Sequence, residues 1–219
     1  MASVVINGDT SGSITLAAPA TAGTNTITLP AQTGTSAVLS SAISAVGQIP
    51  FSTDGSTLTP TAKIVSGTAV ASTSGTSITF SSIPSWVKRV TLILNGVSLS
   101  GSAYYIVQLG SGSATTTGYT ASGGYGFQSG STIAVNTTNG FNIQVAGGTP
   151  ASSTTYGTMT FTNVSGNIWI ASGSGGYSVT SFWSAGGAIS LAGVLDRVIV
   201  TTSNGTDTFD AGSVNILYE

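Results

Sequence analysis

The 219-residue chain contains no histidine and no cysteine. Without histidine it lacks the usual general base and the commonest metal ligand. Without cysteine it lacks a thiolate nucleophile, disulfide bonds and thiolate metal sites. A Ser-His-Asp triad is therefore excluded. We expect the protein not to be an enzyme and to hold no cofactor and no metal.

Charge is also scarce in this sequence. Asp, Glu, Lys and Arg make up 5% of the residues, against roughly 25% in an average globular protein. The net charge of −2 gives no argument for nucleic-acid binding, which depends on clustered Lys and Arg. Because charge normally keeps folded proteins apart, so few ions indicate a chain that covers part of its surface with copies of itself or with a larger assembly.

Long apolar runs are absent as well. No run approaches the ~20 residues needed to span a bilayer. Residues 1–14 contain neither a basic region nor an apolar core of signal-peptide length. We therefore expect no membrane insertion and no secretion signal.

Glycine and β-forming residues are abundant instead. The 30 glycines, together with many Thr, Val and Ile, predict an all-β protein of short strands joined by tight turns. Residues 13–17 and 26–30 are similar alternating segments, and two such strands need partners to be stable. We expect residues 1–35 to form an anchoring β-stalk, residues 36–62 a linker, and residues 63–219 one β-domain.

Thirteen strands are predicted within that domain from alternation and from Ser-Gly, Asn-Gly and Gly-Gly turns. Their number favours a sandwich or jelly roll. They are residues 64–71, 77–80, 88–97, 104–109, 115–120, 133–135, 140–145, 156–163, 167–171, 177–182, 188–191, 194–202 and 213–218.

Asp207 and Asp210 are the only carboxylates paired closely enough for chemistry. Two carboxylates are what glycoside hydrolysis requires, and they could also contribute to a calcium site, although calcium takes ~6–8 oxygen ligands. Residues 204–212 read as a turn between the last two strands. We therefore expect both side chains to accept hydrogen bonds from local backbone N–H groups.

The aromatic residues offer a candidate binding site. Trp86 and Trp169 lie in apolar surroundings and are predicted core residues. Trp183 is a better candidate for stacking on a sugar, together with Tyr125 and Phe127, because the glycine-rich residues 120–130 read as a flexible loop. We expect these three residues to form any glycan or receptor contact.

Several stretches resemble proteins of tailed bacteriophages. Residues 11–19 and 23–30 are similar to the opening of many tail-fibre and virion proteins. A β-domain of phage fibre proteins is resembled by residues 80–90 (FSSIPSWVKRV), 94–98, 195–198 and 204–219 (NGTDTFDAGSVNILYE).

The resemblance implies a jelly-roll-like domain in a homotrimeric virion fibre, a tail fibre or similar appendage. It implies assembly in the host cytoplasm, attachment to other virion proteins through residues 1–40, and a contribution to host adsorption through a surface glycan. It implies no catalytic residues. Two alternatives are a capsid decoration or head-fibre protein and a carbohydrate-binding receptor module.

Overall fold

The structure is a computed structural model that describes residues 64–127, 130, 132–143, 151, 153–178 and 181–219 in full. Four strands before residue 64 are described by their backbone only. The contacts divide the chain into two units, Met1–Val38 and Leu39–Glu219.

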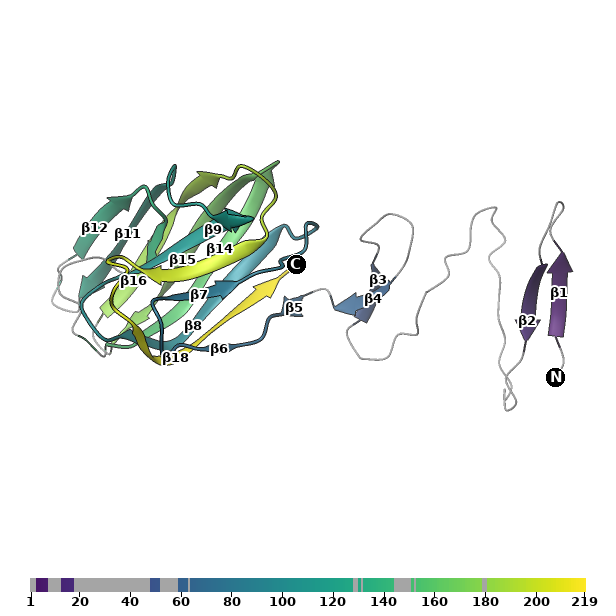
Figure 1. The fold of residues 1–219 in the computed structure, drawn as a ribbon, viewed down its shortest axis with the longest axis horizontal. Coiled ribbons are helices and arrows are strands. Elements are labelled where there is room, and N and C mark those ends of the chain that lie inside the picture. Colours follow the sequence, from purple (N-terminus) through teal and green to yellow (C-terminus); the bar gives the residue numbers. More distant parts are fainter. Residues whose placement is uncertain are drawn as a thin grey trace. The chain divides into compact units, whose positions relative to one another are not determined.

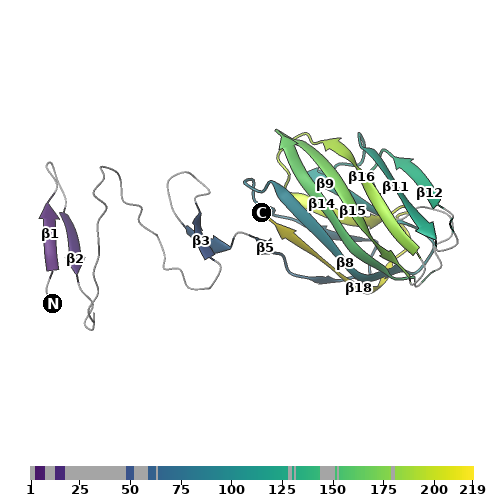
Figure 2. The ribbon, with the colours of Figure 1, turned by 180° about the vertical axis from the view of Figure 1, so that it is seen from behind.

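The larger sheet has nine antiparallel strands in the order β12-β11-β16-β15-β14-β8-β18-β5, and β6 also pairs with β18. Figure 2 shows these strands side by side from β8 to β12. Their bounds are β5 Val65–Ser66, β6 Val70–Ala71, β8 Arg89–Leu99, β11 Thr120–Phe127, β12 Thr132–Thr137, β14 Thr155–Ser165, β15 Ile168–Tyr177, β16 Ser181–Ser190 and β18 Phe209–Tyr218.

The smaller sheet has five strands and covers one face of the larger sheet (Figure 1). Its order is β10-β9-β17-β7, and β13 pairs with β9 on the same side as β10. The bounds are β7 Ser77–Phe80, β9 Tyr105–Ser111, β10 Ser113–Ala114, β13 Phe141–Ile143 and β17 Arg197–Thr202.

Strand alternation places the core between the two sheets. In β8 the side chains of Val90, Leu92 and Leu94 are buried at 3% exposure or less, while Thr91 and Ile93 are half-buried on the opposite face. This is the two-residue period of a strand with one face on the core. The strand predicted at residues 88–97 is thus confirmed as β8, and one cluster of apolar side chains joins both sheets.

Glycine allows β8 and β18 to approach where their register shifts. A Cβ added at Gly212 would lie 2.3 Å from the carbonyl oxygen of Gly96, and both residues have positive φ, 89° and 65°. Such close approach at an irregular pairing requires residues without a side chain. The two strands therefore remain paired on both sides of the irregularity.

Two hairpins lie before the sandwich in sequence. β1 (Ser3–Asn7) pairs with β2 (Ser13–Ala17), and β3 (Gln48–Phe51) pairs with β4 (Thr59–Ala62). The first confirms the strand predicted at residues 13–17, whereas the predicted strand at 26–30 lies outside the described residues. The second lies within the predicted linker.

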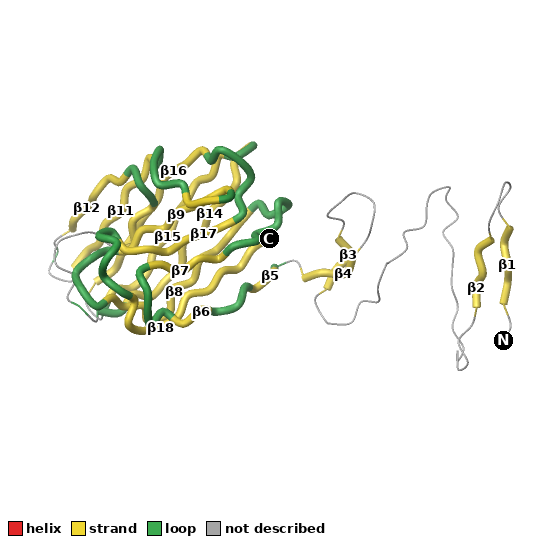
Figure 3. The backbone as a smooth tube through the Cα atoms, in the orientation of Figure 1, coloured by secondary structure: helices red, strands yellow, loops and turns green. Residues whose placement is uncertain are grey.

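The all-β prediction is confirmed, since no helix occurs in the part of the chain that the structure describes (Figure 3). Three local predictions were wrong. Residues 120–130 were expected to be a loop, but Thr120–Phe127 is strand β11, paired on both sides. The strand was not predicted because its many glycines are typical of turns, although glycine also occurs in strands whose backbones pack closely.

The other two errors concern predicted strands. Only Thr120 of residues 115–120 is in a strand, because this segment carries the chain from the smaller sheet to the larger one. Residues 177–182 span the β15–β16 hairpin, in which Tyr177 pairs with Ser181. The sequence there has no Gly, Pro or Asn to signal a turn, and Ser178 adopts a positive φ of 54° instead.

Candidate functional site

Trp183 lies in the core. It alternates inward on β16, has no exposed surface, and its indole N–H donates a hydrogen bond to the Tyr156 carbonyl oxygen at 2.9 Å. The indole packs over Gly157 and Gly175, where an added Cβ would lie 2.8 and 2.6 Å from the ring. A ring enclosed in this way offers no face to a sugar, so its assignment to a surface contact is corrected.

Tyr125 and Phe127 lie on the same side of β11. Their rings meet edge to face with centroids 4.7 Å apart. Tyr125 is only 7% exposed, while Phe127, at the end of the strand, is 37% exposed. Of the three predicted contact residues, only Phe127 therefore presents an aromatic surface.

The two other tryptophans support the sandwich. Trp169 is 3% exposed, which confirms its prediction as a core residue. Trp86 packs partly buried against the core and lies 6.0 Å from the Tyr218 ring, measured between centroids.

Asp207 joins two loops. Its Oδ2 accepts a hydrogen bond from the Ala103 backbone N–H at 2.8 Å, and the carboxylate packs against Gly101. The local turn bonds are made by Asn204, whose Oδ1 accepts from the N–H groups of Thr206 and Asp207. Hydrogen bonds with the Asn204 side chain and the Ala103 N–H hold the pKa of the Asp207 carboxyl below its ordinary value.

Asp210 lies in strand β18 rather than in the predicted turn, because the strand begins at the buried Phe209. Its Oδ1 accepts a hydrogen bond from the Ser98 hydroxyl on β8. The expectation that both aspartates bind local backbone is therefore wrong: both join segments far apart in the sequence. Within the described residues, no group of three acidic side chains could hold a metal ion.

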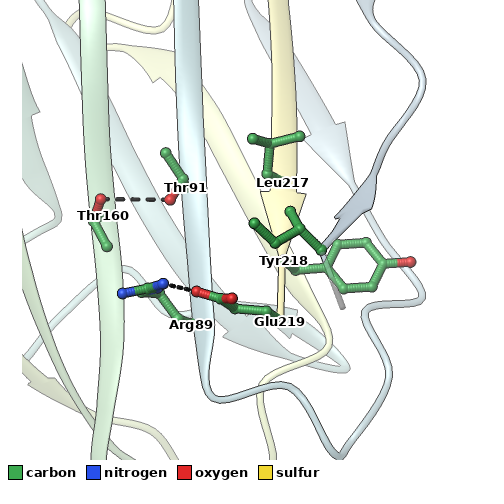
Figure 4. A pocket seen from close by; sticks show the side chains of 7 residues that line it. Arg89, Thr91, Thr160, Leu217, Tyr218 and Glu219 are labelled. Carbon is green, nitrogen blue, oxygen red and sulfur yellow. Dashed lines mark hydrogen bonds and ion pairs between the residues drawn. The ribbon is translucent and has the colours of Figure 1, made fainter. Parts of the chain in front are cut away.

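The sandwich has a proximal end, defined by Ile64, where the preceding chain joins it, and by Glu219. There Arg89 forms an ion pair with Glu219 beside a pocket of about 140 Å³ (Figure 4). Thr91 and Thr160, which also line it, lie with their hydroxyl oxygens 3.5 Å apart. Because Arg89 and Glu219 neutralise each other, neither charge is left over to attract a charged ligand into the pocket.

Exposed aliphatic side chains also gather at the proximal end. Val164, Ile168 and Ile170 are 58%, 43% and 47% exposed on the β14–β15 hairpin. The register brings Ile170 opposite Thr162, which in turn lies opposite Arg89. We call Val164, Ile168 and Ile170 the hairpin patch.

The distal end, opposite, has exposed aromatic side chains and a shallow hollow. The hollow occupies about 310 Å³ on the outer face of the larger sheet, over β12, β11 and β16. The register sets out three rows there: Asn136, Ser122 and Gly186; then Ala134, Gly124 and Ser184; then Thr132, Gly126 and Phe182.

The hollow exists because its central strand, β11, has glycines, Gly124 and Gly126, at two of its outward-facing positions. A Cβ on Gly124 would lie 2.2 Å from the Ile133 carbonyl oxygen, so the tight packing of β11 against β12 excludes any other residue. At one end of the hollow Phe182 is 57% exposed and lies against Gly126, where an added Cβ would be 2.4 Å from the ring. The hollow is therefore lined by the Phe182 ring, by Tyr125 and Ile133, and by small side chains without charge.

Phe182 is the residue that the sequence prediction missed. It directly precedes Trp183, and in a strand only one of two adjacent aromatics can face the core. The larger indole side chain was taken for the exposed one. The structure buries the indole and exposes Phe182.

These features define the class of the protein: an all-β protein with two antiparallel sheets, an apolar patch at one end and an uncharged hollow near the other. Comparison with protein-family models, curated proteins and solved structures gave no match. Among the described residues no helix has the length and apolarity to cross a membrane.

Proposed function

We propose that this protein is a bacteriophage virion structural protein, the subunit of a homotrimeric fibre attached through residues 1–40. The sequence resemblance of residues 80–98 and 195–219 supports the phage assignment. The observation that best supports self-association is the exposure of the hairpin patch. Its three β-branched side chains are exposed in the single chain, and such a cluster typically marks a protein contact.

The position of the hairpin patch supports contact between copies of this chain. The patch lies at the proximal end, where residues 1–63 join the sandwich, so copies held together by that segment would bring their patches close. Ile64 and Val194, 51% and 55% exposed, also line pockets at this end. The hairpin patch itself carries no charged residue, and an aliphatic surface of this kind suits packing between identical subunits.

We further propose a jelly-roll topology for the sandwich and a β-stalk for residues 1–35. The topology is supported by the repeated passage of the chain between sheets, at β6–β7, β7–β8, β8–β9, β10–β11, β12–β13, β13–β14, β16–β17 and β17–β18. The stalk is supported by the β1–β2 hairpin, which is too small to be stable alone. The role we propose is structural, in a virion assembled in the host cytoplasm.

The test is the oligomeric state of the full chain, measured by sedimentation equilibrium at micromolar concentration. A trimer is expected. Ile168→Lys combined with Ile170→Lys should weaken association at least about tenfold, because it places charges in an apolar contact. Val70→Lys, which alters an exposed apolar residue outside the hairpin patch, is the control and should remain trimeric. A monomeric wild-type chain would contradict the proposal.

A capsid decoration or head-fibre protein is the second candidate. The same surface would then hold the copies on a head shell. Quantitative mass spectrometry of purified virions separates the two, with tens of copies expected for a tail fibre and hundreds for a decoration protein.

A further inference from the structure

The hollow at the distal end differs chemically from the hairpin patch. Its lining includes no Asp, Glu, Lys or Arg: besides Phe182, Tyr125 and Ile133, it consists of serine, threonine, glycine and alanine. A charged ligand would lose hydration there without gaining an opposite charge. The site therefore favours a neutral ligand.

The exposed ring sets a second requirement. Phe182 lies against the backbone of Gly126 and leaves more than half of its surface to solvent. An aromatic surface fixed in this way binds an apolar face with little loss of side-chain entropy. The ligand should carry C–H groups on one face.

The hydroxyl groups set a third requirement. Ser122, Thr132 and Ser184 are exposed, and no hydrogen bond occupies their hydroxyls among the bonds of the described residues. Hydroxyls can donate and accept, so they match a ligand whose rim carries both kinds of group. A sugar ring has C–H groups on its faces and hydroxyls around its edge, and it meets all three requirements.

We propose that this hollow, with Phe182 as the stacking residue and Ser122, Thr132 and Ser184 as hydrogen-bonding residues, binds a neutral saccharide. Its volume of about 310 Å³ lies at the lower end of the roughly 300–1,000 Å³ of ligand pockets. That size suits one or two sugar rings. The site does not depend on the fibre assignment.

A longer saccharide has a path beyond the hollow. Tyr156, 46% exposed, lies on β14, two strands away from Phe182 on β16. Between them on β15 lies Gly176, where an added Cβ would meet no atom within 4 Å. The sheet surface between the two aromatic residues is therefore open.

The proposal is tested by ligand-observed NMR on the full chain. The probes are neutral trisaccharides of glucose, galactose, mannose and N-acetylglucosamine. We expect at least one of them to bind, and Phe182→Ala to weaken that binding about tenfold, since the stacking contact and its buried area are lost together. Ser184→Ala should weaken it about threefold. The matched control is Val70→Ala, at an exposed apolar residue of β6 in the same sheet, outside both the hollow and the hairpin patch, which should bind like wild type.

Circular dichroism and sedimentation of each variant separate binding from folding and assembly. No binding by any probe, or unchanged binding by folded Phe182→Ala, would overturn the proposal. A change of oligomeric state in Phe182→Ala without any sugar binding would assign the hollow to a second copy of the chain and overturn it as well. A monomeric wild type that still binds sugar through Phe182 would contradict only the fibre proposal.

Discussion

At the scale of single residues, several of the charged side chains that the structure describes make structural contacts. Arg197 donates to Asp196 from Nε at 2.8 Å, and the Gly112 N–H donates to the same carboxylate at 3.0 Å. The hydrogen bonds from Arg197 are the main reason that the pKa of Asp196 lies below its ordinary value. Asp207 holds a loop in a similar way. Carboxylates bound like this lose their role when protonated.

Asp207 makes stability depend on acid pH. Its folded-state pKa lies below the ordinary 3.8, so its contribution is present above that value and is lost as the pH falls through the folded-state pKa. We expect Asp207→Asn to lose less stability than wild type between pH 3.8 and about pH 2, measured by urea unfolding. At neutral pH the Ala103 amide should exchange with deuterium roughly tenfold faster in the variant. Equal acid sensitivity of the two proteins would contradict this role.

At the scale of elements, alternation predicted the strands whose one face meets the core. Residues 77–80 were predicted with the bounds that the structure shows, and residues 88–97 nearly so. Glycine-rich segments were misread, because glycine serves both a turn and a strand that packs closely, as at Gly123 and Gly124. Which of the two applies depends on neighbouring strands far away in the sequence.

The candidate site was less predictable than the fold. Trp183 itself was expected to be exposed, but it is buried, and its neighbour Phe182 is exposed instead. Which of two adjacent side chains faces solvent depends on how the alternation of the strand is positioned relative to the core, and the residue types alone do not show this. The hollow itself depends on register, because it forms only where Gly124 lies between Ala134 and Ser184.

The Tyr119 side chain supplies hydrogen bonds to the β9 backbone at a position on one edge of β9 where no strand that the structure describes pairs with it. β13 pairs with β9 at residues 105–107 and β10 pairs with it at 110–111, which leaves Leu109 between them on that edge. The Tyr119 hydroxyl accepts from the Leu109 N–H at 2.8 Å and donates to its carbonyl oxygen at 3.3 Å. Burial raises the pKa of Tyr119 to about 12.

We therefore expect Tyr119→Phe to lower the free energy of unfolding by about 1–3 kcal/mol, because a buried N–H loses its partner. Chemical denaturation measures this, and Tyr104→Phe, at a half-buried tyrosine, is the control with a loss below about 0.5 kcal/mol. The raised pKa also means that the tyrosine's contribution declines from about pH 10 upward. Tyr119→Phe should therefore lose less stability than wild type as the pH rises above about 10. Equal stability of Tyr119→Phe and wild type would remove this role.

At the scale of the whole molecule, the surface separates two kinds of apolar exposure. Most of the exposed aliphatic side chains lie at the proximal end, whereas the exposed aromatic ones, Phe127, Tyr156 and Phe182, lie toward the distal end together with Ile133. Aliphatic clusters pack against other proteins, while isolated rings beside hydroxyls suit a ligand with both C–H and O–H groups. Under the two proposals, one subunit associates through one end and binds a saccharide near the other, as expected of a fibre that contributes to host adsorption.

The scarcity of charge gives the proposed assembly a measurable property. Ion pairs between subunits weaken as salt screens them. Apolar contacts are not screened by salt, and sulfate strengthens these apolar contacts. The hairpin patch contains no charged residue. We therefore expect the dissociation constant of the oligomer to change less than about twofold between about 0.05 M and about 0.5 M sodium chloride, and to fall in sodium sulfate. Analytical ultracentrifugation at each salt concentration measures this. A tenfold weakening in sodium chloride would assign the contact to the few ionic side chains, such as Arg89, and away from the hairpin patch.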